Sequence, residues 1–364
     1  MKNVKICITC VNGFLTYDFI NSLRQQKDFA VTIIGVDVSD SNRGSILCDK
    51  FYKISSPKNS KKFIKDLLFI YKRERFDILF PLSDIENYII LKNFRNLKKI
   101  NFKLPSNNFL ISDLFFYKKK FLIFCKKNEI NTGEFYFVQN YKEISLIIKN
   151  SNKKFILKPS SGSGTKNVFL INNLIQYKKK ILELRECYEL NYNILKKENI
   201  FRLIKEYILM PYYEGNIYDV DCIALNGKIK HILIRKREIL NRFMYYSTGH
   251  KVIKNHKIFN LISDFVKKTN LTGISDFDVI SHKNNYYLLE ASCRFSGSVG
   301  VSTKAGLNFP AQMVRLLLKL KSVKNKIIYN KSYRSFLTIQ EIEKSKNKIL
   351  LNDYVPYFAI QNKY

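Results

Sequence analysis

The pattern of apolar segments changes near residue 105, and this change constrains the fold more than any other feature. Before it, apolar runs of strand length alternate with amphipathic stretches of helical length. The expected strands cover residues 4–9, 30–38 and 77–82, and the expected helices cover about 16–26, 60–74 and 84–95. This β-α-β-α-β alternation predicts a doubly wound parallel sheet. Because no GxGxxG fingerprint is present, this α/β domain need not bind NAD.

Beyond residue 105 the strand-like runs come mostly in pairs, which predicts antiparallel sheets and an α+β region. Residues 217–225 and 229–237 flank an Asn-Gly turn, a strong hairpin signal. Residues 274–292 form a second expected hairpin that turns at 283–285. One helix is expected near 112–128 and a last strand near 335–342.

The net charge of +33 offers two interpretations. One is a nucleic-acid or anionic-membrane binder. The other is a genome biased toward lysine, which we favour because the basic residues are spread over the whole length among acidic ones. No zinc-finger, RNP or basic-helix pattern appears, so the sequence does not favour nucleic acid as a partner. A positive charge would also attract anionic substrates such as ATP.

The cysteines and the hydropathy pattern indicate a cytoplasmic protein. Seven cysteines are present, and only Cys7 and Cys10 are close in sequence, without a second pair or a histidine nearby. Such a set suits a reducing compartment. Neither a signal-peptide pattern nor an apolar run long enough to span a membrane is expected.

A lysine and a flexible loop form the first candidate phosphate site. Lys158 ends the expected strand 153–159, and the loop SSGSGTKN follows at 160–167. Backbone N–H groups of a Gly/Ser-rich turn can wrap phosphates, and a lysine adds a point charge. The spacing is not that of a P-loop, so an ordinary flexible hairpin loop is an equally good interpretation.

Two carboxylates on the second hairpin form the candidate metal site. Asp278 and Glu290 lie at about equal distances from the expected turn, so they should face each other on adjacent strands. Like charges side by side repel unless a cation bridges them, and oxygen ligands suit Mg²⁺. The alternative is a pair of solvated strand carboxylates, which the apolar neighbours disfavour.

Basic residues next to these elements complete the pattern. Arg294 follows the second metal strand, where an arginine can stabilise charge on a transferring phosphoryl group. Arg235, Lys236 and Arg237 end another strand, and alternate members could hold phosphates. An exposed basic strand end is the equal alternative.

The order of these pieces resembles the ATP-grasp superfamily, in particular the branch similar to the large subunit of carbamoyl phosphate synthase. The likeness covers residues about 1–345. It rests on the segments VKICITCVNG, IIGVDVS, FDILFPLSDIE, FYKKKFLIFCKKNEI, IKEYIL, YYEGNIYDVD and DFDVISHKNNYYLLEASCRFSGS. The resemblance implies a pre-ATP-grasp domain over 1–105, a small lobe or lid over 106–200, a large lobe over 201–318, and a basic segment with a closing strand over 319–364.

The resemblance also implies the roles of individual residues. Asp278, Glu290 and Ser292 would be metal ligands, and Lys158, Arg237 and Arg294 would be catalytic. The residues expected to bind ATP are Lys118, Lys158, Ser161, Gly162, Ser163, Gly164, Lys166, Glu206, Tyr207, Ile208 and Glu214. ATP and Mg²⁺ or Mn²⁺, as two ions, are the expected cofactors.

Three positions depart from the family pattern. Ser292 replaces the usual asparagine after the metal glutamate, Ile217 stands where a ribose-binding acid is common, and Asn167 replaces a loop glycine. Glu214 could substitute for the ribose acid. These departures leave open a protein that binds ATP with altered or lost catalysis.

The expected activity is an ADP-forming carboxylate–amine ligase that works through an acylphosphate. The partners would be a small-molecule carboxylate and an amine, selected by loops at 239–250 and 295–305. The sequence identifies neither substrate, and it leaves the oligomeric state open. A basic nucleic-acid-binding protein remains the second alternative.

Overall fold

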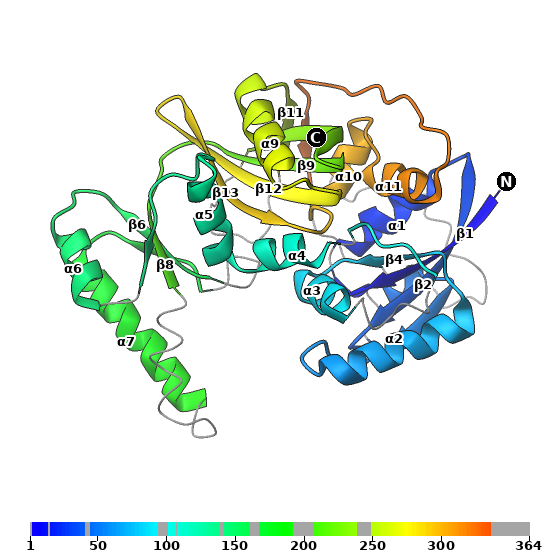
Figure 1. Ribbon diagram of the computed structural model, residues 1–364, viewed down its shortest axis with the longest axis horizontal. Coiled ribbons are helices and arrows are strands. Elements are labelled where there is room, and N and C mark those ends of the chain that lie inside the picture. The colour runs from blue at the N-terminus through cyan, green and yellow to red at the C-terminus, as the bar shows by residue number, and fades with distance from the viewer. Residues whose placement is uncertain are drawn as a thin grey trace, which may run out of the picture. The chain divides into compact units, whose positions relative to one another are not determined.

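The computed structural model describes residues 2–13, 15–40, 44–93, 101–106, 108–138, 141–160, 167–191, 207–238 and 249–335 of the chain. Residues 1–334 form one compact unit. Its described part contains three sheets, each with helices beside it (Figure 1). The combination of one parallel and two antiparallel sheets confirms the expected mixed α/β and α+β class.

The N-terminal sheet is parallel and has the order β3-β2-β1-β4. Its elements are β1 (Lys2–Thr9), α1 (Thr16–Arg24), β2 (Phe29–Asp37), η1 (Ser45–Leu47), β3 (Lys50–Lys53), α2 (Ser60–Glu74), β4 (Ile78–Pro81) and α3 (Asp84–Asn93). The short edge strand β3 was not predicted, because only the middle of KFYK is apolar and even that part is only half-buried. The doubly wound parallel sheet is confirmed, with β1 and β4 adjacent at its switch point.

Local signals account for the boundaries of α2. The Asn59 side chain accepts a hydrogen bond from the Lys62 N–H at 3.3 Å, which caps the first turn. Arg75 takes a left-handed conformation with φ 51° and ends the helix. The helix therefore spans the predicted residues 60–74.

The large sheet has the order β13-β12-β9-β10-β11-β14. Its strands are β9 (Ile217–Leu225), β10 (Lys228–Arg237), β11 (Gly249–Ile253), β12 (Gly273–His282), β13 (Asn285–Ser292) and β14 (Ser332–Arg334). The helices of this region are α9 (His256–Lys268), α10 (Val299–Lys304) and α11 (Phe309–Leu318). Both predicted hairpins are confirmed, but β14 was not predicted, and the expected strand 335–342 lies beyond the described residues except for residue 335.

Positive φ angles at the tips explain the two tight hairpin turns. Asn226 and Gly227 have φ 50° and 69°, and Lys283 and Asn284 have φ 47° and 63°. Two left-handed residues form the turn that matches the twist of paired strands. The second turn is thus one residue shorter than the predicted 283–285.

The small sheet has the order β5-β8-β6-β7 and is antiparallel. Its strands are β5 (Tyr136–Phe137), β6 (Phe155–Pro159), β7 (Phe169–Ile171) and β8 (Tyr207–Pro211), accompanied by α6 (Tyr141–Lys149) and α7 (Leu174–Asn191). Because β8 pairs with β5 and β6, it belongs to this sheet. We therefore propose that the small lobe extends to about residue 211 rather than ending at 200.

The single helix expected near 112–128 is two helices. α4 (Phe109–Phe116) and α5 (Lys118–Lys127) meet at Tyr117, whose extended backbone (φ −105°, ψ 97°) interrupts the helical path. The break places Lys118 in the first turn of a new helix. Its backbone N–H donates to the Ser160 carbonyl at 2.7 Å, which ties α5 to the end of β6.

Phe295, just beyond β13, packs against α1 and β4 of the N-terminal sheet region. Its ring packs edge-on against Phe19 of α1 and Phe80 of β4, with centroids 4.8 and 5.5 Å away. We expect Phe295→Leu to lower the free energy of unfolding by about 1–3 kcal/mol, since it removes two aromatic contacts and some buried volume. Chemical denaturation measures this change.

The control for this prediction is Phe259→Leu. Phe259 lies on α9 and its side chain is 39% exposed, so its loss should change stability by less than about 0.5 kcal/mol. Equal effects of the two substitutions would contradict the role assigned to Phe295.

Candidate functional site

The two faces of the large sheet differ in chemistry. One face is apolar: Val220, Phe277 and Val279 pack with side chains of α4, α5 and α9 in one core cluster. Alternate residues of the same strands point to the opposite face. That face carries five carboxylates, from Asp219, Asp221, Asp276, Asp278 and Glu290.

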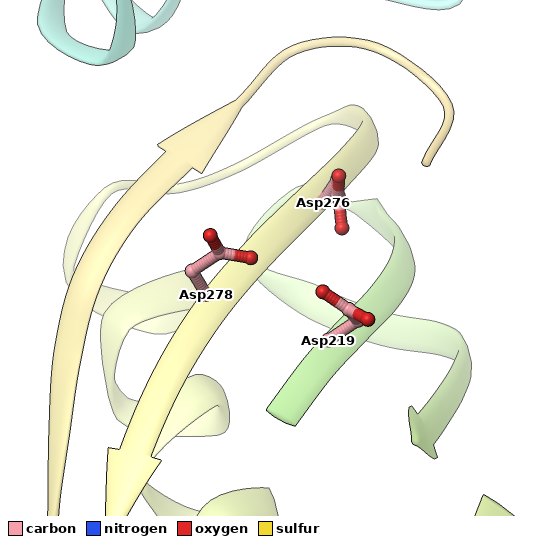
Figure 2. Close-up of side chains that lie close together, drawn as sticks. All are labelled: Asp219, Asp276 and Asp278. Atoms are coloured by element: carbon pink, nitrogen blue, oxygen red, sulfur yellow. The ribbon is translucent and has the colours of Figure 1, made fainter. Parts of the chain in front are cut away.

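Strand register brings these carboxylates together. Asp278 of β12 lies opposite Asp219 of β9 on one side and opposite Glu290 of β13 on the other. The predicted pairing of Asp278 with Glu290 across the hairpin is therefore present. Figure 2 shows Asp276 and Asp278 on one strand with Asp219 beside them on the next, and one oxygen from each lies within 4.8 Å of the others.

Arg237 bridges two of the acids. Its Nη2 donates to Asp278 Oδ1 at 2.6 Å, and its Nε donates to Asp219 Oδ1 at 2.7 Å. His250 of β11 also contacts Asp219, with 2.9 Å between Nε2 and Oδ2. Burial raises the pKa of Asp219, but Arg237 and His250 outweigh it and hold that pKa well below its usual range.

Glu290 and two lysines meet from three separate elements. Lys118 Nζ lies 3.3 Å from Glu290 Oε2, and Lys158 of β6 is buried nearby. Burial raises the pKa of Glu290, but Lys118 and Lys158 outweigh it and lower the pKa to about 2. Burial, reinforced by Lys118, lowers the pKa of Lys158, although Glu290 opposes the shift. The Glu290 carboxylate therefore stays ionised beside Lys118 and Lys158.

The other two acids on β12 have raised pKa values. Burial and the carboxylates of Asp219 and Glu290 raise the pKa of Asp278, although Arg237 opposes the shift. Burial also raises the pKa of Asp276 to about 7, although Arg294 opposes it. One oxygen of Asp276 is buried and has no hydrogen-bond partner among the described residues. An added cation would relieve both carboxylates.

Arg294 links the acidic face to helix α3. Its Nη1 donates to Asp276 Oδ2 at 3.0 Å, and its Nε donates to Asp84 Oδ2 of α3 at 3.2 Å. The nearby Asn87 donates from Nδ2 to the Cys293 carbonyl at 3.2 Å. The first turn of α3 is thereby held against the segment that follows β13.

Arg235 neither faces the Asp219–Asp278 pair nor lies at an exposed strand end, the two positions that the sequence suggested. It is fully buried and donates to Asp221 Oδ1 at 2.6 Å, to Ser296 Oγ at 3.0 Å and to the Ser298 carbonyl at 3.0 Å. Arg235 and Arg237 alternate at the end of β10, and of these two only Arg237 contacts Asp219 and Asp278. Arg235 instead holds residues 296–298 on the sheet.

Several predicted ATP-binding residues stay as predictions. Ile208 of β8 lies opposite Lys158 in the strand register, and Tyr207 lies opposite Pro159. Glu214 is exposed, and its carbonyl lies 3.1 Å from His282 Nδ1. Ser292 lies opposite Asp276 in the hairpin. The predicted residues that fall outside the described part of the chain are Ser161, Gly162, Ser163, Gly164, Lys166 and Glu206.

Sequence reasoning missed Asp219, Asp276 and His250. Among the described residues, Asp219, Asp276 and Asp278 lie close enough together to share a metal ion. Of the three predicted ligands, only Asp278 belongs to this cluster. The alternating acids in YDVDC and SDFDV carried a usable signal, because residues two apart on a strand share a face. His250 follows a segment with no clear strand pattern, so no local signal pointed to it.

Comparisons with known proteins agree with this architecture. Residues 204–344 match the family model described as "ATP-grasp in the biosynthetic pathway with Ter operon", which is less than half of the chain. No curated protein sequence matches. Within the described residues, no helix is both long and apolar enough to cross a membrane.

Several solved structures have a similar fold over most of the chain. N5-carboxyaminoimidazole synthetase from Staphylococcus aureus with ADP has a TM-score of 0.68 and 15% identity, covering 91% of this chain and 82% of that one. L-amino acid ligase from Bacillus licheniformis has a TM-score of 0.63 and 15% identity, with coverages of 88% and 75%. Biotin carboxylase from Campylobacter jejuni has a TM-score of 0.66 and 13% identity, with coverages of 89% and 74%. The chain therefore shares the fold of these three enzymes, and its residues 204–344 match an ATP-grasp family model.

Proposed function

We propose that this protein is an ATP- and Mg²⁺-dependent ligase that joins a carboxylate to an amine and releases ADP and phosphate. The observation that carries the proposal is the convergence of Asp278, Glu290, Lys118 and Lys158. These four ionisable side chains come from the β12–β13 hairpin, α5 and β6. Bringing them together removes them from water, which is unfavourable for charged groups. Paired carboxylates with two lysines can receive a metal–triphosphate complex.

The described residues fit a divalent cation. Asp278 and Glu290 offer oxygen ligands, the kind that Mg²⁺ prefers, and the Glu290 side chain is 36% exposed and therefore accessible. The unpartnered Asp276 oxygen and the raised pKa of Asp278 both indicate uncompensated negative charge. Bound Mg²⁺ would neutralise part of the phosphate charge. We propose Asp278 and Glu290 as its ligands, with Ser292 as a weaker third.

The surrounding residues have separate tasks in this proposal. Lys118 and Lys158 hold phosphate oxygens, and Arg237 and Arg294 offset negative charge at the reacting centre. The backbone of Tyr207 and Ile208 is proposed to hold the adenine, together with Glu206, and Glu214 is proposed to hold the ribose. The loop residues Ser161 to Gly164 and Lys166 would cover the phosphates.

The reaction has two bond exchanges. A carboxylate oxygen bonds to the γ-phosphorus of ATP while the bond to the β-phosphate oxygen breaks, which releases ADP and leaves an acylphosphate. An amine nitrogen then bonds to the carbonyl carbon, phosphate leaves, and the nitrogen loses a proton. The resemblance of L-amino acid ligase in fold supports a small carboxylate and amine as the substrate class.

The test is incubation of the protein with Mg-ATP, a pool of small carboxylates and a pool of amines. We expect ADP and phosphate in equal amounts, and their release should require both pools. Hydroxylamine in place of the amine pool should trap the acylphosphate as a hydroxamate. Release of AMP and pyrophosphate would refute the proposed chemistry.

Ser292 favours one second candidate, an ATP-binding protein without catalysis. A serine is a poorer metal ligand than the asparagine common at this position in the resembling family. This candidate predicts Mg-ATP binding in calorimetry without ADP release from any pool. Ser292→Asn would then be expected to raise turnover.

A further inference from the structure

The edge of the N-terminal sheet next to Arg294 contains a second set of polar side chains. In doubly wound sheets, ligands bind beyond the carboxyl ends of the strands, at the point where strand order reverses. Here that point lies between β1 and β4, since the sheet order is β3-β2-β1-β4. Thr9 ends β1, and α3 begins three residues after β4.

Glu86, in the first turn of α3, lies at this switch point. Its side chain is buried, with only 4% of the residue exposed. Oε2 accepts a hydrogen bond of 2.6 Å from Thr9 Oγ1. Among the described residues, no hydrogen bond or ion pair reaches the second oxygen, Oε1.

No cation compensates this carboxylate within the described residues. The neighbouring ionisable groups are Asp37, Cys10 and Cys7, and each of these is neutral or negative. A buried carboxylate without a compensating positive charge is costly, so it takes up a proton or a cationic ligand. Burial accordingly raises the pKa of Glu86 to about 7, despite the Thr9 hydrogen bond.

Asp37 shows what a satisfied acid at the same edge looks like. Its two oxygens accept backbone N–H groups from Asn12 and Ser39, both at 2.9 Å. It therefore organises the loop after β1. Among the described residues, Glu86 has no comparable pair of backbone donors, and we assign its Oε1 to a ligand.

Helix α3 connects Glu86 to the candidate active site. Asp84, in the same first turn, forms an ion pair with Arg294 at 3.2 Å. A molecule held at Glu86 therefore lies beside the helical turn that contacts the arginine proposed to act at the reacting centre.

We propose that Glu86 binds the ammonium group of the amine substrate, so that this site selects cationic amines. The ammonium group gives one proton to the Glu86 carboxylate, which frees the lone pair of the nitrogen for attack on the acylphosphate, and the second proton leaves after the C–N bond has formed. The inference deepens the proposed ligase function and rests on it. Glu86 is assigned recognition of the amine, whereas transfer of the phosphoryl group belongs to the residues of the large and small sheets. Thr9 positions the carboxylate through its hydroxyl.

The test compares wild type with Glu86→Gln and Glu86→Asp. Glutamine has the shape of the protonated acid and keeps an acceptor for Thr9, so the fold should persist, as thermal melting would verify. With a carboxylate from the active pool and methylamine or an amino acid as the amine, we expect Glu86→Gln to raise KM for the amine at least 10-fold. Glu86→Asp keeps the charge and should stay closer to wild type.

Hydroxylamine separates the two half-reactions, since it is mostly uncharged at neutral pH and does not need an ammonium site. In Glu86→Gln, hydroxamate formation should fall far less than amide formation. Glu143→Gln, at an exposed position on α6, is the matched control and should change neither.

Three outcomes would be decisive. An unchanged KM for amines in folded Glu86→Gln would show that Glu86 is a protonated structural residue and would overturn the inference. Equal losses of amide and hydroxamate would overturn it as well, because the residue would then serve the phosphoryl step. The absence of hydroxamate with wild type would instead refute the proposed function itself.

Discussion

Glu290→Gln is expected to reduce ADP formation about 10³-fold, which corresponds to about 4 kcal/mol of transition-state stabilisation. The substitution removes one proposed metal ligand and the carboxylate that lies 3.3 Å from Lys118. It also leaves Lys118 and buried Lys158 close together without the acid between them. Steady-state release of ADP from Mg-ATP, with the active substrate pools, measures the loss.

Glu134→Gln is the matched control for Glu290→Gln. Glu134 is an exposed carboxylate that pairs with Lys153 at 3.3 Å, away from the acidic face. Exposed pairs contribute little, so both activity and stability should stay near wild type. A loss of less than about tenfold in Glu290→Gln would exclude Glu290 as a metal ligand.

Arg235→Met should lower the free energy of unfolding by about 3–5 kcal/mol, the cost of leaving one buried partner unpaired. Asp221 is buried, and its remaining polar contact would be the Ser302 hydroxyl at 2.5 Å. The substitution also removes the hydrogen bonds that hold residues 296–298. Urea denaturation gives the change, provided that the slope of the transition stays the same.

Two further variants make this prediction sharper. Arg235→Met combined with Asp221→Asn removes the stranded charge and should recover a large part of the stability. Arg334→Met breaks an exposed pair with Glu238 at 2.7 Å and should cost less than about 1 kcal/mol. If the double variant were less stable than Arg235→Met alone, the buried pair would not explain the effect.

Local sequence patterns were sufficient to predict most of the strands and both hairpins. Apolar runs predicted β1, β2 and β4, and turn residues predicted both hairpins, because these signals depend only on residues near each other in the chain. The Asn-Gly turn and the Lys-Asn turn set the register of their strands. Counting outward from the predicted turn at 283–285 placed Asp278 opposite Glu290. The observed turn is one residue shorter, and a bulge between Asp278 and Val279 restores this pairing.

Elements with weak local patterns were missed or misplaced. β3 and β14 are short edge strands without a strong apolar run, and the break at Tyr117 depends on how α4 and α5 pack. β8 has the same apolar pattern in either lobe, so only its pairing with β6 assigned it to the small sheet.

The sequence by itself determined β1, β2, β4 and the two hairpins, and it predicted that Asp278 and Glu290 meet across the second hairpin. The tertiary structure decided which charges meet: Lys118 with Glu290, Arg237 between Asp219 and Asp278, Arg294 between Asp84 and Asp276, and Arg235 buried beneath residues 296–298. The reason is physical. Backbone periodicity is local, whereas the partner of a buried charge is set by desolvation and by the packing of segments far apart in the chain.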